Sequence, residues 1–312
     1  CDGRSRRCWA SQGGNGMTKK NELPTNESNP SKPHLSASSL GLFAKCPEAY
    51  RRRYVEGERS KTNIAMGIGK AFHKSVEANM KSKIDHGTEL PLDDLKEIGR
   101  DSLSDAIKDC DESDDDGKLM KDVEAQIEFH VLHQAPDYQP NAIEVPFRIE
   151  LDACGHDYVG YIDMTGTLIN SGDPVIVDWK TSKKKPAKDS QHDSLQLTGY
   201  FASQAMELGE KVELRLDYIT SGKTKRVRHV LATRRDADDV AALAQRIHIA
   251  SKTIEAGIFP PAASDSAWWC GASWCQYHST CKYVNPKRRE KEQAREQVKA
   301  AMDLISINAG NE

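Results

Sequence analysis

The sequence lacks any long hydrophobic run. Nowhere in its 312 residues do about 18 apolar residues follow one another, as a membrane-spanning helix requires. The first residues also lack the apolar segment of a secretory signal. From these two absences we expect a cytoplasmic protein with no membrane partner.

The sequence has little excess charge of either sign. Its 44 Lys and Arg against 47 Asp and Glu leave a net charge of -3, which excludes a uniformly basic nucleic-acid-binding protein. The charges are segregated, however: an acidic run occupies 111–117, and basic runs occupy 51–53, 183–185 and 223–229. Such segregation allows a local phosphate-binding surface on an acidic protein. The alternative is that each run is a solvated face.

Apolar periodicity is absent from the first 33 residues. The segment before Met17, with Cys1 and Cys8, resembles an upstream extension, and the residues after it are rich in Ser, Asn, Pro and Lys. We therefore expect residues 1–33 to be disordered or extraneous. Residues 34–284 then form one domain, and residues 285–312 form a basic C-terminal helix or tail.

Hydrophobic periodicity predicts helices around a sheet in the rest of the chain. Ser36 is a suitable N-cap for a first helix, which Pro47 interrupts. Ile68 and Phe72 begin a stripe that repeats every fourth residue and predicts a buried helix. Helices that flank a mixed sheet belong to the α/β or α+β class. The expected helices are 68–84, 92–110, 118–133, 195–208 and 237–256, and the expected strands are 142–151, 157–168, 174–181, 212–220 and 226–232.

Two neighbouring strands carry a candidate acidic site. Side chains alternate along a strand, so Asp178 and Lys180 point to the same face. Asp163 belongs to the preceding strand. If an even number of residues joins the two strands, Asp163 lies across from Asp178 or Lys180 on the same face. An odd number places Asp163 on the opposite face. Two carboxylates this close repel unless a cation lies between them, and their oxygens suit Mg²⁺ or Mn²⁺. The alternative is a half-buried ion pair between Asp163 and Lys180.

Two helices add polar side chains at a four-residue spacing. Gly69, His73 and Glu77 lie on one line beside the apolar stripe, so an imidazole and a carboxylate face partly inward. A lone histidine near a core face is usually a satisfied side chain, but here a glutamate lies one turn away. Gln196 and Tyr200 lie one turn apart on a later helix, where they can hydrogen-bond a phosphate or position a lysine.

In this order, the motifs resemble those of the PD-(D/E)XK nuclease superfamily, and of its RecB-like exonuclease branch in particular. The resemblance spans residues 35–281. The usual Pro-Asp of the family is replaced here by Ile162 and Asp163. The motifs are G-x-x-x-H-x-x-x-E at 69–77, G-Y-I-D at 160–163, V-D-W-K-T at 177–181 and Q-x-x-x-Y at 196–200.

The resemblance implies a restriction-endonuclease-like core and a DNA exonuclease that depends on Mg²⁺ or Mn²⁺. Lys180 would be the catalytic lysine, and Gln196 and Tyr200 would support the site and the DNA strand. The implied metal ligands are His73, Asp163, Asp178 and the carbonyl of Trp179, with Glu77 as an outer or occasional ligand.

The resemblance also implies a biological setting. Compact phage and mobile-element genomes carry such nucleases for recombination, repair or genome processing, so the expected host is a bacterium or a phage-infected cell. A catalytically inactive DNA-binding module of the same fold is the alternative function. A structural metal protein with incidental acidic residues is a third.

Three cysteines lie close together near the end of the expected domain. Cys270, Cys275 and Cys281 occupy one short loop, and in a cytoplasmic chain such spacing favours a metal over disulfides. Cys46 is the candidate fourth ligand. The layout resembles that of RecB-like nucleases, related to CRISPR-associated adaptation nucleases, which hold a [4Fe–4S] cluster with one early and three late cysteines. Zinc, with His278 able to replace one thiolate, is the alternative, and a metal-free loop is another.

The cysteine-rich loop is also rich in aromatic residues. Trp268, Trp269, Trp274 and Tyr277 all lie within it. We expect them to pack around the thiol site. Stacking of nucleic-acid bases on their rings is the alternative.

Overall fold

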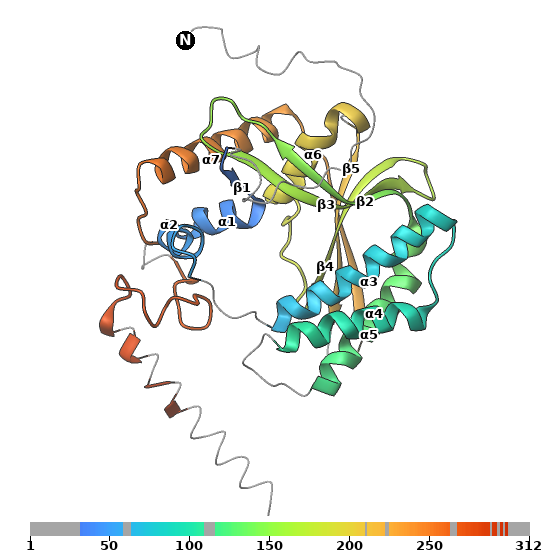
Figure 1. Ribbon diagram of the computed structural model, residues 1–312, viewed down its shortest axis with the longest axis horizontal. Coiled ribbons are helices and arrows are strands. Elements are labelled where there is room, and N and C mark those ends of the chain that lie inside the picture. The colour runs from blue at the N-terminus through green and yellow to red at the C-terminus, as the bar shows by residue number, and fades with distance from the viewer. Residues whose placement is uncertain are drawn as a thin grey trace, which may run out of the picture.

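The computed structural model describes residues 32–58, 64–108, 116–209, 211–221, 225–262, 267–287, 289–291, 294–295 and 297–298. Helices pack on both faces of a central sheet (Figure 1). The expected N-terminal extension, the C-terminal tail and the acidic run lie largely outside the described residues. Within these ranges, no helix has both the length and the apolar character that crossing a bilayer requires.

The central sheet has six strands and is mixed. Strand β3 pairs antiparallel with β2 along one edge and with β4 along the other, where its first residues also pair parallel with β1. Strand β4 pairs parallel with β5, which pairs antiparallel with the edge strand β6. The strands are β1 (His34–Leu35), β2 (Tyr138–Ile149), β3 (Asp157–Leu168), β4 (Pro174–Ser182), β5 (Glu213–Ser221) and β6 (Arg226–Thr233).

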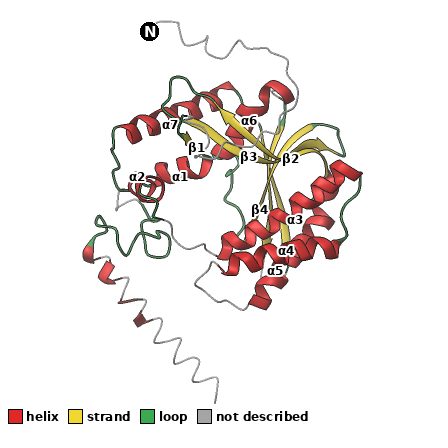
Figure 2. Ribbon diagram, viewed as in Figure 1, coloured by secondary structure: helices red, strands yellow, loops and turns green. Residues whose placement is uncertain are grey.

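The helices form two groups. Figure 2 shows α3, α4 and α5 on one side of the sheet, and α1, α6 and α7 on the other. The elements are α1 (Ala37–Lys45), α2 (Pro47–Tyr50), the π-helical turn η1 (Arg51–Val55), α3 (Ile64–His86), α4 (Leu92–Lys108), α5 (Asp116–His133), the 3-10 turn η2 (Ala135–Asp137), α6 (Leu195–Leu208) and α7 (Ala237–Glu255).

Each face of the sheet buries its own hydrophobic core, and β4 contributes to both. Val177 and Trp179 point into the core formed with α3, α4 and α5, where Phe72 is fully buried. Ile176 points into the other core, which contains Leu197 and the ring of Tyr200 from α6. Because β4 is covered on both faces, its apolar residues form a continuous run rather than an alternating pattern.

Helix α6 connects the parallel strands β4 and β5 and lies close to β3. A Cβ atom on Gly199 would lie only 2.5 Å from the ring of Tyr158, so glycine allows this approach. The Tyr158 hydroxyl donates to the carbonyl of Leu195 at 3.1 Å. These contacts set the height of α6 above the sheet, and with it the positions of Gln196 and Tyr200.

The mixed class expected from the sequence is confirmed. The short strand β1 and the turn η1 were not expected, and most other differences are at element ends. Ser36 caps α1 as expected, because its hydroxyl accepts from the Ser39 N–H at 3.3 Å. Helix α3 begins four residues earlier than expected, although Gly67 disfavours helix there. Gly67 packs against Ala106 of α4, where an added Cβ would lie at 2.8 Å, so tertiary packing overrides propensity. Strand β2 also begins early, because Pro140 is accommodated at a register shift.

Candidate active site

The ladder between β3 and β4 ends beside two aspartates. The last backbone pair is Met164 with Val177, and the next residues, Asp163 and Asp178, face each other. At this point the N–H of Trp179 donates to Oδ2 of Asp163 at 2.9 Å. The hairpin connection contains an even number of unpaired residues, which is the condition for the two carboxylates to share a face.

Three potential metal ligands converge at this opening of the sheet. His73 projects from α3, and its Nδ1 lies 3.4 Å from Oδ2 of Asp163. One ligand atom from each of His73, Glu144 and Asp163 lies within 4.8 Å of the other two. Carboxylate oxygens with an imidazole nitrogen suit a divalent cation such as Mg²⁺ or Mn²⁺. The residues present therefore fit the metal that the sequence motifs imply.

Sequence reasoning missed Glu144. The pairs that flank it on β2 place it directly opposite Asp163. Its φ angle of 47° lies in the left-handed region of backbone conformation, which residues other than glycine and asparagine rarely adopt. Such strain persists only where the surrounding structure maintains it, and it is concentrated at functional sites. The only sequence signal was an acidic residue inside an apolar strand.

Lys180 is held by a hydrogen-bonded chain that runs to α6. Its Nζ lies 2.6 Å from Oδ2 of Asp178 and donates to Oε1 of Gln196 at 3.2 Å. Nε2 of Gln196 donates to the hydroxyl of Tyr200 at 2.6 Å, and that hydroxyl donates to Oδ1 of Asp178 at 3.2 Å. Asp178 is fully buried, so both of its oxygens depend on these partners. The structure thus brings together the four residues predicted on β4 and α6.

Burial and neighbouring charges shift the pKa values of the ionisable side chains in the site. Burial, and next the charge of Asp178, raises the pKa of Asp163 well above its usual value. Burial and the charge of Glu77 raise the pKa of Glu144. Burial alone would lower the pKa of Lys180, but Asp178 and Asp163 outweigh it and raise the value, so the lysine stays an ammonium. Groups perturbed in this way are typical of functional sites.

His73 differs from its acidic neighbours in the direction of its shift. Burial lowers its pKa, and the nearby Lys180 adds to this effect, although Asp178 opposes it. The imidazole is therefore neutral near pH 7. A neutral ring has the free lone pair that metal binding requires.

The opposite face of β4 is supported by a buried polar network. The indole of Trp179 contacts the ring of His130 edge-on, with centroids 5.5 Å apart. The neighbouring strand residue Asp217 is fully buried and accepts from the Tyr138 hydroxyl at 2.7 Å and from Nη2 of Arg228 at 2.7 Å. This network fixes β4 and β5 behind the site. Arg228, which belongs to the basic run at 223–229, therefore stabilises the fold through Asp217.

The predicted outer ligand Glu77 lies apart from the converging three. Its carboxylate accepts from Nζ of Lys74 at 2.8 Å, and it acts on the site through its charge, which raises the pKa of Glu144. Gly69 faces β4, where an added Cβ would be in ordinary contact with Oγ1 of Thr181 at 4.0 Å. The Trp179 carbonyl and the roles of the other site residues remain predictions.

Comparison with known proteins places the chain in a family. The model of the PD-(D/E)XK nuclease superfamily matches residues 34–282, which include every residue of this site. The chain belongs to that superfamily. The match confirms the family that the ordered motifs indicated.

Two proteins are similar to this PD-(D/E)XK nuclease, one in sequence and one in fold. It is 25% identical over 294 residues to the Gene 69 protein of Mycobacterium phage L5, covering 80% of this chain and 96% of that protein. It also resembles the crystal structure of a candidate exonuclease from Eubacterium rectale, with a TM-score of 0.50 and 15% identity, covering 85% of this chain and 96% of that one. The second likeness shows the shared fold.

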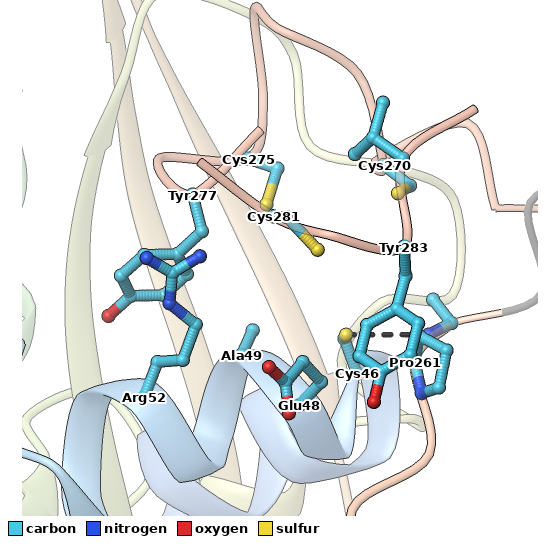
Figure 3. Close-up of a pocket in the computed structure, with 12 residues that line it drawn as sticks. Cys46, Glu48, Ala49, Arg52, Pro261, Cys270, Cys275, Tyr277, Cys281 and Tyr283 are labelled. Atoms are coloured by element: carbon cyan, nitrogen blue, oxygen red, sulfur yellow. Dashed lines mark hydrogen bonds between the residues drawn. The ribbon is translucent and has the colours of Figure 1, made fainter. Parts of the chain in front are cut away.

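A second cluster of chemically active side chains lies away from the acidic site of this nuclease. Cys46, Cys270, Cys275 and Cys281 line one cavity between α2 and the C-terminal loop. Figure 3 shows their sulfur atoms directed toward the space between them. Burial raises the pKa of Cys275, and the charges of the other three thiols add to the shift. The thiol side chains predicted to act together are therefore neighbours in space.

Hydrogen bonds join the two segments that carry the thiols. The Ala262 N–H donates to Sγ of Cys46 at 3.4 Å, and Nε1 of Trp269 donates to the Lys45 carbonyl at 3.2 Å. The Tyr277 hydroxyl donates to the Glu58 carbonyl at 2.8 Å. The N-terminal helices and the C-terminal loop thus pack together, as expected.

The expected packing of the aromatic residues is wrong for two of the four. Tyr277 is buried, but Trp268 and Trp274 are 63% and 64% exposed. The two indoles are not among the residues that line the thiol cavity, whereas Tyr277 is.

Proposed function

We propose that this nuclease is a metal-dependent DNA exonuclease. The observation that carries the proposal is the convergence of His73, Glu144 and Asp163 on one point, beside a lysine that Asp178 holds. The DNA substrate and the exonucleolytic mode come from the likeness of the motifs to the RecB-like branch. The Eubacterium rectale protein of similar fold is itself described as a candidate exonuclease.

The residues divide the chemistry between them. His73, Glu144 and Asp163 would hold a divalent cation. The predicted ligand Asp178 lies outside this group, opposite Asp163 across the strands, and its oxygens contact Lys180 and Tyr200. When bound, the cation activates water and neutralises charge on a phosphoryl oxygen. Lys180 is cationic, so it donates hydrogen bonds to the attacking water or to the phosphate rather than accepting a proton. Gln196 orients the ammonium group and Tyr200 orients the carboxylate beneath it.

A digestion assay tests this function. Linear DNA should be degraded with Mg²⁺ or Mn²⁺, and EDTA should stop the reaction. Lys180→Ala should lower the rate at least a hundredfold, in the range expected when a group that stabilises the transition state is removed. Lys81→Ala, at an exposed position of α3, is the matched control and should leave the rate unchanged.

The substrate form separates the remaining alternatives. An exonuclease should spare covalently closed circles and end-blocked duplexes that an endonuclease cuts, and a deoxyribonuclease should spare RNA of the same sequence. Binding to DNA without turnover under any divalent metal would favour the inactive DNA-binding module instead.

We further propose that the four thiols hold a [4Fe–4S] cluster. The four thiols line one cavity between α2 and the C-terminal loop. Their order along the chain, one early cysteine and three late ones, resembles that of the RecB-like nucleases that hold such a cluster, which supports iron over zinc. Protein purified without oxygen should be brown and contain about four irons per chain; a colourless protein with one zinc would reverse the assignment.

The biological setting proposed is DNA processing in a phage or a mobile element. Its support is the Gene 69 protein of Mycobacterium phage L5, which this chain matches over most of both lengths. Expression of the chain in a bacterial host, followed by measurement of recombination between short linear DNAs, tests this setting. An unchanged recombination frequency with active enzyme present would argue against it.

A further inference from the structure

Three tryptophans of the C-terminal loop form an open aromatic surface. The rings of Trp268 and Trp269 lie 5.8 Å apart, and those of Trp268 and Trp274 lie 5.0 Å apart, both edge-on. Trp268 and Trp274 are nonetheless mostly exposed. Exposing two large indoles to water costs free energy that folding would normally recover by burial, so such a patch is typical of a binding surface.

This aromatic surface lines a hollow rather than a flat face. A cavity of about 350 Å³ lies between the three tryptophans and the segment from α1 to η1. That volume falls in the range of sites for small organic groups. Trp269 is anchored by its hydrogen bond to the Lys45 carbonyl, so one wall of the hollow is fixed before anything binds.

Among the described residues that line the hollow, the charged side chains are cations. These are Lys45 and Arg53. Arg51 and Arg52, next in the sequence, are instead paired with Glu48 and Glu58. Aromatic faces with cations at the rim match the chemistry of single-stranded nucleic acid, whose bases stack while its phosphates meet positive charge.

The hollow and the thiol cavity share lining residues. Cys46 and Cys275 line both the thiol cavity and the hollow, so these two residues form part of the wall that the two cavities share. Tyr277 takes part in both as well, and its hydroxyl fastens the loop to the Glu58 carbonyl. The loop that carries Trp268 and Trp274 is therefore held against the segment from α1 to η1, beside the thiol site.

We propose that this tryptophan hollow binds unpaired bases of a single DNA strand. The inference deepens the proposed function, on which it rests for the identity of the polyanion. Bases would stack on Trp268 and Trp274, and the ammonium of Lys45 and the guanidinium of Arg53 would contact the phosphates. The hollow would then hold a strand apart from the acidic site, as a separate binding site of the same enzyme.

Equilibrium binding in EDTA tests the hollow without cleavage. The probe is a fluorescein-labelled oligo(dT) added to the full chain, and a blunt duplex of equal length is the comparison. Trp268→Ala with Trp274→Ala should weaken oligo(dT) binding at least tenfold, in line with typical losses of base stacking. Trp268→Phe with Trp274→Phe should restore most of the affinity, because phenyl rings also stack.

Controls separate this role from a general effect on folding. Ile249→Ala removes an apolar side chain that is 63% exposed on α7, and it should leave binding unchanged. Lys45→Ala and Arg53→Ala should weaken binding mainly at low salt and reduce its salt dependence. Tryptophan fluorescence of the parent should be quenched by oligo(dT), and less so in the double Ala variant.

Each outcome bears on the proposal. Oligo(dT) binding within twofold of the parent in the double Ala variant would overturn it. So would self-association of the parent that the double Ala variant loses, because the hollow would then be covered by a second copy. If the chain cleaves no DNA but loses oligo(dT) binding in the Ala variants, the hollow stands and the nuclease proposal falls. If the Ala variants bind oligo(dT) and cleave DNA as the parent does, the nuclease proposal stands and the proposed role of the hollow falls.

Discussion

Glu144 and Asp163 face each other across β2 and β3, and Glu144 does so with a left-handed backbone. We expect Glu144→Gln to weaken Mn²⁺ binding at least tenfold, because a carboxylate ligand becomes a neutral amide. The thermal midpoint in EDTA should rise at the same time, since a half-buried carboxylate with a raised pKa is removed from a cluster of like charges. Titration calorimetry and a melt of the metal-free protein measure both effects.

Glu150→Gln is the matched control for Glu144. It removes an exposed carboxylate beside the end of the same strand and should change neither quantity. Equal Mn²⁺ affinity in Glu144→Gln and the parent would show that the three ligand atoms do not share one ion.

Tyr200→Phe should act on catalysis through Asp178. The hydroxyl donates to Oδ1 of that fully buried carboxylate, so its loss leaves an acceptor unsatisfied. We expect stability to fall by about 1–3 kcal/mol. We also expect kcat to fall about tenfold or more with little change in KM, because Tyr200 positions Lys180 and its partner rather than the DNA.

Tyr54→Phe provides the comparison for Tyr200, since its ring is 44% exposed. It should leave kcat and the urea midpoint as they are. A Tyr200→Phe enzyme with full kcat but lower stability would mean that the hydroxyl serves only the fold.

Cys281→Ser should affect the fold as well as any bound metal. The thiol site joins α2 to the C-terminal loop, so losing one ligand should lower the melting temperature and remove visible absorbance together. Cys154→Ser, at a buried cysteine outside the cavity, should keep the absorbance. An unchanged melting temperature in Cys281→Ser would show that the site does not connect the two segments.

His130 should make stability depend on pH. Burial lowers its pKa to about 4, although the hydrogen bond to Gln134 opposes the shift. An unfolded histidine takes up its proton near pH 6.5, so between about pH 6.5 and 4 the unfolded state binds more protons. Stability is therefore fully present above that window and falls as pH decreases, by about 2 kcal/mol at pH 5.

His130→Gln removes this titration and keeps a group that can hydrogen-bond Gln134. Urea midpoints of both proteins at pH 8 and pH 5 give the comparison. The variant should lose less stability than the parent between the two pH values, and equal losses would assign the pH dependence to other groups.

Local patterns in the sequence determined the fold class and most elements, because strand alternation and helical stripes are properties of neighbouring residues. The expected β3 and α6 match the observed strand and helix at both ends. The ordered motifs also pointed to the family. Turn parity placed Asp163 and Asp178 on one face, and helical spacing placed Gln196 and Tyr200 one turn apart, because both are local properties.

Tertiary structure alone decided what depends on distant segments. Glu144 joins His73 and Asp163 only because β2 pairs with β3 in one register, and no spacing in the sequence reports that pairing. Exposure of Trp268 and Trp274 likewise depends on how α1 and the C-terminal loop meet. Burial and the convergence of ligand atoms arise from packing between segments far apart in the chain. A sequence pattern can therefore suggest candidate metal ligands, but only the folded chain shows which of them lie close enough together to bind one ion.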